Sequence, residues 1–488
     1  MQQQQIYERA RLARDARFDG QFYIGVITTG IYCRPICPAN SPKAENIKFY
    51  PSAAAAADAG FRPCLRCRPE CAPGSPAWSG TSTTVRRGLR LIANGALDSD
   101  GIENLAERLG VTSRHLRRLF TRHIGASPLA VAHTQRLHFA KRLIDETTLP
   151  LNNIAIAAGF NSTRRFNDTF KKTYGRSPGQ LRKLGRRQNN PDPEAALSVR
   201  LPYRQPFAWN ELLAFFRHRA TPGVEVVDGD CYRRTLLVDN RQAVVELRPS
   251  AKGNYLALTL HRVPTPSLFE TVQKARDVFD LDAPVAEIAT VLSSDPLLEK
   301  MLQAHPGIRV PGAWDGFELT IRAILGQQIS VKAATTLAGR IAARYGEPLD
   351  HASPDKNGLL YLFPGAERLS RAKFDKIGLV QSRANTIQSV AKAVVSGDLQ
   401  FDTANDPEKF CTVLKSIKGI GDWTAQYVAM RALKNPDAFP ASDLGLLKSL
   451  HYPERISPAE LSRHAERWRP WRAYAALLLW NSLSGSGG

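Results

Sequence analysis

The sequence predicts a chain of several α+β domains, and three observations support this prediction. Its 488 residues are too many for one hydrophobic core, so three or four domains are expected. Between residues 197 and 263, the runs YRRTLLV, AVVELRP and NYLALTLHRV alternate as antiparallel strands do. The stretches over about 85–184 and beyond 268 instead carry apolar residues at helical spacing. The expected order is a small cysteine-rich α/β domain over 1–78, an all-α domain over 79–184, a linker over 185–196, a small antiparallel β-domain over 197–275, a helical domain over 276–482 and a disordered tail over 483–488.

Four cysteines near the N-terminus have the spacing of a metal site. Cys33 and Cys37 form a CxxxC motif, and Cys64 and Cys67 form a CxxC motif about thirty residues later. This pattern is typical of four thiolates around one tetrahedral Zn²⁺. From the spacing alone, a closed zinc site that only stabilises the fold remains an open alternative. The motifs are flanked by arginines that would offset the negative charge of the site and hold a polyanion nearby: Arg34, Arg62, Arg66 and Arg68.

The charge balance indicates an extended polyanion as partner. The net charge is +21 and the pI is about 9.9, and many dispersed Lys and Arg side chains favour double-stranded DNA. A membrane surface is the other polyanion, but no apolar run reaches the ~20 residues that span a bilayer. The first twenty residues also lack the apolar core of a signal peptide. We therefore expect a monomeric, cytoplasmic and nucleoid-associated protein with no membrane partner.

The segment GIENLAERLGVTSRHLRRLFTRHIG has the pattern of a helix-turn-helix. Apolar residues at helical spacing precede and follow a turn at 110–112: Ile102, Leu105, Ala106, Leu109, Leu116, Leu119 and Phe120. The second helix is expected to present a cationic outer face for DNA: Arg114, His115, Arg117 and Arg118. A single helical pair with exposed arginines is more often only a solvated surface.

The pattern recurs about fifty residues later, around a turn at 159–161. Ile154, Ile156 and Ala157 precede this turn, and Phe166 and Phe170 are expected to pack behind it. The outward side chains of the second copy are expected to be Arg164, Arg165 and Asn167. The two copies, the second with the pattern GF…F…FKK…G.SP…R, resemble the AraC-type DNA-binding domain over roughly a hundred residues. The resemblance implies two recognition helices in successive major grooves.

The cysteine-rich segment precedes this AraC-type domain, and it resembles the N-terminal domain of the Ada family of adaptive-response regulators over about 75 residues. The similar stretches are FDGQFYIGVITTGIYCRPICPA and NIKFYPSAAAAADAGFRPCLRCRPE. The resemblance implies one zinc per chain and assigns Cys33 as both ligand and nucleophile, which takes a methyl group once from an S-diastereomer methylphosphotriester in DNA. It leaves Cys71 outside the ligand set. Cys231 and Cys411 are expected to be buried small apolar residues.

The run KSIKGIGDWTAQYVAMRAL predicts a helix-hairpin-helix. Gly419 and Gly421 would let backbone amides approach a DNA phosphate closely. Twenty residues beyond Trp423, FPASDLGLL places Asp443 at the start of a helix. This spacing, with LPYRQPFAWNELLAFFRHRATPGVE and PGAWDGFELTIRAILGQQIS, resembles the AlkA-type 3-methyladenine DNA glycosylases over 197–480.

The second resemblance implies a catalytic Asp443 and a pocket for a flipped, alkylated base. Its aromatic walls would be Trp423, Tyr427 and Trp480, with Phe215 a weaker candidate; for any one of them, core packing is the simpler explanation. Gln328 stands where the family has an apolar wedge. Trp423 occupies the position of the Schiff-base lysine in bifunctional relatives, so a monofunctional glycosylase is expected.

Together the resemblances imply a fusion of an Ada-type sensor and activator with an AlkA-type glycosylase. The expected partners are alkylated DNA and promoter DNA, with RNA polymerase as a further candidate. One alternative is a pure DNA-binding transcription regulator whose hairpin domain is not catalytic, which Asp443 at its spacing argues against. Another is a glycosylase with a tethering DNA-binding module and no sensor, which the CRPxC motif argues against. No Pro-Cys-His-Arg motif of the O6-methylguanine methyltransferase half is present.

Overall fold

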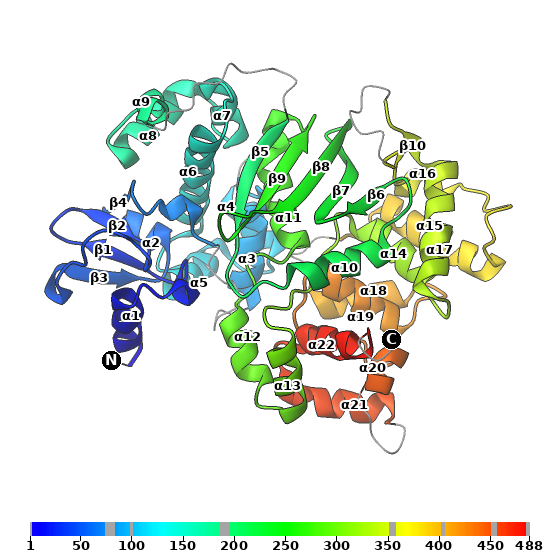
Figure 1. Cartoon of the computed structure of the whole chain (residues 1–488). Helices are drawn as coiled ribbons and strands as arrows, with labels where there is room; N and C mark the ends of the chain where they lie inside the picture. Colours follow the sequence, from blue (N-terminus) through cyan, green and yellow to red (C-terminus); the bar gives the residue numbers. More distant parts are fainter. Residues whose placement is uncertain are drawn as a thin grey trace. The chain divides into compact units, whose positions relative to one another are not determined.

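The computed structural model describes residues 2–73, 83–97, 101–184, 196–350, 358–401, 406–449 and 456–484 (Figure 1). The chain divides into two compact units. The first contains residues 1–205, 250–276 and 281–284, and the second contains 206–249, 277–280 and 285–488. Nearly all of the predicted linker lies outside the described residues. Residues 483–484, which the sequence assigned to the disordered tail, continue helix α22, and the rest of that tail is not described.

The N-terminal part of the first unit is a small α/β domain, as predicted. Helix α1 (Gln2–Leu12) precedes a sheet of strand order β3-β1-β2-β4, in which β2 pairs in parallel with β4 and the other pairs are antiparallel. The strands are β1 (Tyr23–Val26), β2 (Ile31–Cys33), β3 (Ile47–Tyr50) and β4 (Arg62–Pro63). Helix α2 (Ala53–Asp58) is capped by Ser52, whose hydroxyl accepts from the Ala55 amide at 3.0 Å.

The all-α domain contains the two predicted helix-turn-helix units. Its helices are α3 (Thr83–Ala93), α4 (Ile102–Arg108), α5 (Ser113–Ile124), α6 (Pro128–Glu146), α7 (Leu151–Ala157), α8 (Thr163–Tyr174) and α9 (Pro178–Leu184). The second helices, α5 and α8, start with side-chain caps from Thr112 and Ser162 and end at glycines with left-handed φ. The long α6 connects the first helix-turn-helix to the second and also packs against α2.

One apolar residue of the second helix-turn-helix lies outside its core. Ile156, one of the three apolar residues named before the turn, is 48% exposed. The buried face of α7 is formed instead by Ile154, Ala155 and Ala157. A helix advances about 100° per residue, so position 156 falls outside the face that the other three residues share.

The strands after residue 196 are antiparallel, as the alternation predicted. In the first unit, β5 (Leu197–Pro202) pairs with β9 (Tyr255–His261). In the second unit, β6 (Glu225–Asp228), β7 (Cys231–Val238) and β8 (Arg241–Pro249) form a meander. Helix α11 (Leu268–Val278) follows β9, and α10 (Trp209–Arg219) precedes β6. A short pair joins β10 (Glu347–Pro348) to β11 (Tyr361–Leu362).

Helices make up the remainder of the second unit. They are α12 (Val285–Leu292), α13 (Pro296–Ala304), α14 (Gly316–Leu325), α15 (Val331–Tyr345), α16 (Ala366–Ser370), α17 (Gln381–Ser396), α18 (Pro407–Lys415), α19 (Asp422–Arg431), α20 (Leu444–Ser449), α21 (Pro458–His464) and α22 (Arg472–Ser484). The almost wholly buried α14 packs against α15, α17 and α19, and α20 packs against α22. Within the described ranges, no helix is long and apolar enough to cross a bilayer.

A buried cluster of four charges connects β6 and β7 to α14. Arg234 contacts Glu225 at 3.0 Å and Glu318 at 2.6 Å, while Arg322 contacts the same two carboxylates at 2.9 and 3.0 Å. Two positive and two negative charges compensate each other, which is the condition for burying ionised groups. The cluster therefore fixes the position of α14 beneath the cavity described below.

Candidate functional sites

The four predicted zinc ligands meet at one point. The ligand sulfurs of Cys33, Cys37, Cys64 and Cys67 all lie within 4.8 Å of one another. The parallel pairing of β2 with β4 explains this, because Tyr32 lies opposite Pro63 and each is followed by a cysteine. A zinc–sulfur distance of ~2.3 Å in a tetrahedron separates the sulfurs by ~3.8 Å, so the four side chains fit Zn²⁺.

The cysteines differ in accessibility. Cys33 and Cys37 are partly exposed, whereas Cys64 and Cys67 are buried. Cys71 lies outside the cluster, and burial raises the pKa of its thiol to about 11. An external group can therefore reach the sulfurs of Cys33 and Cys37 more easily than those of Cys64 and Cys67.

Arg34, predicted to contact DNA, already has partners inside the protein. Its Nε donates to Asp19 at 2.8 Å and its Nη1 donates to the Cys67 carbonyl at 3.0 Å, while its backbone amide donates to the Cys67 sulfur at 3.4 Å. The Arg34 side chain is only 12% exposed. Arg34 thus supports the metal site directly, and its DNA contact stays a prediction. Arg62 and Arg66 are exposed.

The predicted DNA-facing arginines and Asn167 of the helix-turn-helix units are exposed, His115 is half-buried, and the aromatic residues behind them are buried. On α8 the exposed residues are Arg164, Arg165 and Asn167, and on α5 they are Arg114, Arg117 and Arg118. Arg117 approaches Glu103 at 3.7 Å, but the Arg117 side chain is 50% exposed and the Glu103 side chain is 73% exposed. Water screens such a pair, so it holds Arg117 only weakly. Both recognition helices therefore keep a cationic face.

The predicted hairpin is formed by α18 and α19. Gly419 has φ +95°, and a Cβ at this position would lie 2.1 Å from Thr386 Oγ1. Only glycine satisfies both the conformation and the close approach to α17. Gly421 precedes α19, and a Cβ there would meet nothing within 4 Å, so the helix N-terminus stays open to a ligand. Gln327 holds the turn by donating to the Gly419 carbonyl at 3.1 Å.

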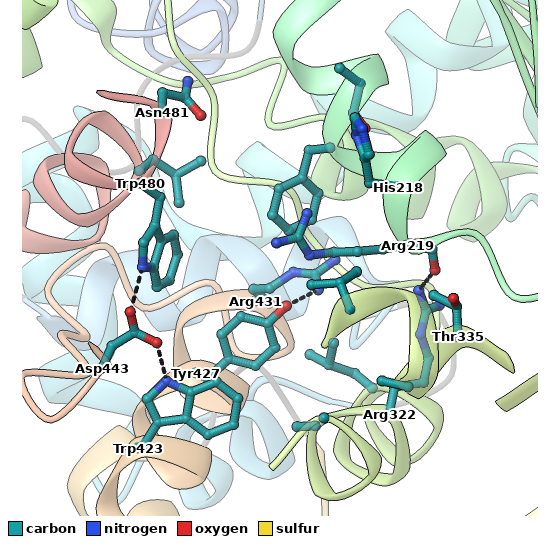
Figure 2. A pocket seen from close by; sticks show the side chains of 18 of the residues that line it. His218, Arg219, Arg322, Thr335, Trp423, Tyr427, Arg431, Asp443, Trp480 and Asn481 are labelled. Atoms are coloured by element: carbon teal, nitrogen blue, oxygen red, sulfur yellow. Dashed lines mark hydrogen bonds between the residues drawn. The ribbon is translucent and has the colours of Figure 1, made fainter. Parts of the chain in front are cut away.

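A cavity of about 890 Å³ lies in the second unit (Figure 2). The structure brings together Asp443 and all four predicted pocket aromatics in its lining: Phe215, Trp423, Tyr427 and Trp480. Trp423 and Tyr427 are one helical turn apart on α19, and their rings stack at 5.3 Å with an interplanar angle of 9°. The Trp480 ring stands edge-on to Tyr427 at 6.4 Å. Gln328, by contrast, is exposed, has φ +57° and is not among the described residues that line the cavity.

Three donors orient the Asp443 carboxylate, which caps α20. Oδ2 accepts from Trp423 Nε1 at 2.7 Å, and Oδ1 accepts from Trp480 Nε1 at 2.9 Å and from the Leu446 amide at 3.0 Å. These bonds cross from α19 and α22 to the start of α20 (Figure 2). Donors to both oxygens of a carboxylate fix its direction. The site thus offers a fixed anion at the edge of an aromatic cavity.

Sequence reasoning missed three arginines that also line the cavity. Arg219 lies at the end of α10, Arg322 on α14 and Arg431 at the end of α19. Arg431 donates to the Tyr427 hydroxyl at 2.6 Å. The four-residue spacing from Tyr427 to Arg431 was a readable signal for that contact. Nothing in the local sequence of α10 indicated that Arg219 would share the same cavity.

Four family models match the chain. They are the metal binding domain of Ada over residues 7–70, a helix-turn-helix domain over 105–184, the AlkA N-terminal domain over 198–315 and the HhH-GPD superfamily base excision DNA repair protein over 321–472.

Relatives match the chain over its whole length or over its C-terminal part. The chain is 41% identical over 481 residues to a probable bifunctional transcriptional activator/DNA repair enzyme AlkA of Mycobacterium tuberculosis, covering 97% of this chain and 95% of the relative. It is 34% identical over 283 residues to DNA-3-methyladenine glycosylase 2 of Escherichia coli, covering 57% and 95%. The solved 3-methyladenine DNA-glycosylase from Archaeoglobus fulgidus matches with a TM-score of 0.51 at 25% identity, covering 58% of this chain and 97% of that one.

These findings define a class of protein in which a zinc-containing, methyl-sensing DNA-binding regulator and a DNA glycosylase share one chain. The cysteine cluster and the Ada-type match assign one Zn²⁺ to it. The chain belongs to the family of bifunctional transcriptional activators and DNA repair enzymes of this Ada and AlkA type. The alternative of a pure regulator is not supported, because the hairpin domain matches a base excision repair family and surrounds a cavity with an oriented carboxylate.

Proposed function

We propose that the C-terminal domain hydrolyses the N-glycosidic bond of alkylated bases such as 3-methyladenine, with Asp443 as the catalytic carboxylate. We also propose that Cys33 accepts methyl groups from DNA methylphosphotriesters. The observation that carries the glycosylase proposal is the Asp443 carboxylate, held by three donors at the edge of a cavity walled by aromatic rings. The relatives whose printed names include 3-methyladenine glycosylase support the choice of base.

The proposed excision uses the charge of Asp443. A flipped base stacks on the Trp423 and Tyr427 rings, which lie nearly parallel on α19. The C1′–N bond breaks and both electrons leave with the base, so positive charge develops on the sugar. The Asp443 carboxylate stabilises this charge, a water molecule attacks C1′, and the proton of that water passes to Asp443. An alkylated purine is already cationic and departs as a neutral base.

A monofunctional reaction is part of the proposal. A lyase step needs an amine that forms a Schiff base with the sugar. No lysine occurs among the described residues lining the cavity, and Trp423 occupies the hairpin position that the amine would need. The product should be an intact abasic site, and strand cleavage without added base would contradict this part of the proposal.

The proposed methyl transfer uses the exposed edge of the cysteine cluster. Cys33 and Cys37 are the partly exposed members, and Cys33 ends strand β2. When bound, zinc keeps the cysteines as thiolates at neutral pH. The Cys33 sulfur attacks the methyl carbon in line, a sulfur–carbon bond forms, and the carbon–oxygen bond breaks with its electron pair left on the phosphodiester oxygen.

Methylation of Cys33 removes one negative charge from a surface that faces phosphates. At ~6–8 Å and an effective dielectric constant of 20–80, that charge is worth roughly 0.5–3 kcal/mol per neighbouring phosphate. Affinity for promoter DNA should therefore rise, which would convert the sensor into an activator. We further propose that the chain acts as a monomer at the nucleoid and that RNA polymerase is its partner during activation.

Both proposals can be tested in one reaction. The full chain is incubated with methylated duplex DNA, followed by peptide mass mapping and chromatography of released bases. A gain of about 14 Da, the mass of one methylene, should appear on the Cys33 peptide, and 3-methyladenine should appear in solution. Cys33→Ser should lose only the mass gain, and Asp443→Asn should lose only the base release. Methyl groups on Cys37 or Cys71 in the wild type would contradict the assignment of the acceptor.

A further inference from the structure

The glycosylase cavity carries opposite charges at two ends. Asp443 lies at one side with the Trp423 and Trp480 indoles, and the guanidinium groups of Arg219 and Arg431 lie beyond Tyr427 (Figure 2). A base that stacks on the aromatic rings therefore has a carboxylate on its sugar side and cations on its far side. The proposed reaction uses only the carboxylate, so the cations need an explanation of their own.

These two cations are not compensated by acids. Among the described residues, neither Arg219 nor Arg431 has a carboxylate within 4.0 Å. Arg322, in contrast, is paired with Glu225 and Glu318 at 2.9 and 3.0 Å. The other acidic residue in the lining, Glu211, faces His305 at 3.5 Å. The far end of the cavity thus keeps a net positive charge.

Both guanidinium groups are held in place. Arg219 lies over the Phe215 ring at 3.9 Å and Arg431 lies at 4.8 Å from the same ring. Arg431 also donates to the carbonyls of Pro311 and Gly312 at 2.9 and 3.0 Å. Their field reaches the stacking surface: burial alone would raise the pKa of Tyr427, but the charges of Arg431 and Arg219 outweigh it and lower that pKa below its usual range.

We propose that Arg219 and Arg431 form the base-side counterpart of Asp443 and determine how well the enzyme removes neutral damaged purines. This inference rests on the glycosylase function proposed above. When the C1′–N bond breaks, the electron pair moves onto the base. A neutral purine then develops negative charge, which the guanidinium groups stabilise before the base nitrogen takes a proton from water. A cationic alkylpurine undergoes the same change of one charge but ends neutral. Compared with free enzyme and DNA, its transition state therefore gains no such stabilisation, and its bound ground state is repelled by the guanidinium groups instead.

Arg219 is the residue to test, because Arg431 also supports the loop at 311–312. Two duplexes that differ in one lesion would be used, one with neutral hypoxanthine and one with cationic 7-methylguanine. Single-turnover excision rates of the full chain are measured at enzyme concentrations far below saturation, so that they report kcat/KM, for the wild type, Arg219→Met and Arg219→Lys. The Met variant keeps an apolar stem against Phe215 and removes the charge, while the Lys variant keeps the charge.

The readout is the ratio of kcat/KM for hypoxanthine to kcat/KM for 7-methylguanine. One charge at ~7 Å, with an effective dielectric constant of 20–80, predicts that Arg219→Met lowers this ratio by about threefold to fiftyfold. Arg219→Lys should restore most of it. A ratio that stays constant in Arg219→Met, or falls as far in Arg219→Lys, would show that charge is not the determinant and would overturn the inference.

The excision results of the wild type show which proposal fails, the role of the arginines or the glycosylase function on which it rests. Release of 7-methylguanine without hypoxanthine would overturn the role of the arginines and leave the glycosylase proposal standing. Release of neither base, from protein that binds both duplexes, would show that the proposed excision itself is wrong.

Discussion

Replacing Asp443 with asparagine tests the centre of the glycosylase proposal. The substitution removes the negative charge and keeps the size of the side chain. With a charge separation of about 4 Å and an effective dielectric constant of 20, the lost stabilisation of the sugar cation is about 4 kcal/mol. That corresponds to a rate about a thousandfold lower.

The hydrogen bonds around Asp443 predict a second, smaller effect. An asparagine oxygen placed at Oδ1 still accepts from Trp480 and from the Leu446 amide. Its amide group then faces the Trp423 Nε1–H, and two donors cannot bond to each other. We expect a loss of about 1–2 kcal/mol in the stability of the glycosylase unit, without unfolding.

The assay is single-turnover release of 3-methyladenine, together with binding to damaged duplex measured by fluorescence anisotropy. Affinity should remain within about threefold, because the hairpin and the aromatic rings supply ground-state binding. Asp398→Asn is the matched control, since Asp398 is exposed and lies outside the cavity lining. Excision within tenfold of the wild type by folded Asp443→Asn would refute the assignment of the catalytic group.

Three further predictions concern the metal site, the recognition helices and the buried charges. The double variant Cys64→Ser/Cys67→Ser should contain less than one zinc per chain by plasma mass spectrometry, because two of four ligands are gone; a full equivalent would refute the ligand set. Arg164→Ala should weaken promoter binding by about 1–3 kcal/mol if Arg164 contacts a base edge, whereas equal weakening on unrelated DNA would show a phosphate contact. Burial opposes ionisation of Glu225, but two buried arginines outweigh it and lower its pKa from 4.5 to about 2. Its contribution to stability, about 3 kcal/mol, is therefore complete above pH 4.5 and is lost as the pH falls towards 2. Denaturation of Glu225→Gln should be less sensitive to pH in that window, and an unchanged pH profile would contradict the ion-pair account.

Local patterns in the sequence determined much of this protein. The spacing within the CxxxC and CxxC motifs predicted the metal site. Helical periodicity and turn residues, within about twenty-five residues each, predicted the two helix-turn-helix units. The glycines of the hairpin were also readable, because Gly419 needs a backbone conformation that other residues rarely adopt. Each of these features depends on neighbours along the chain.

The tertiary structure alone decided what the local patterns left open. The position of Ile156 on the exposed side of α7 depends on which face the rest of the domain covers. Arg34 was expected to face DNA, yet its guanidinium pairs with Asp19 from a separate segment. Arg219 and Arg431 are more than two hundred residues apart in the sequence and share one aromatic ring only because α10 and α19 line the same cavity. Charge compensation and orientation arise from contacts between distant segments, and a sequence pattern specifies the residues without specifying which of them meet.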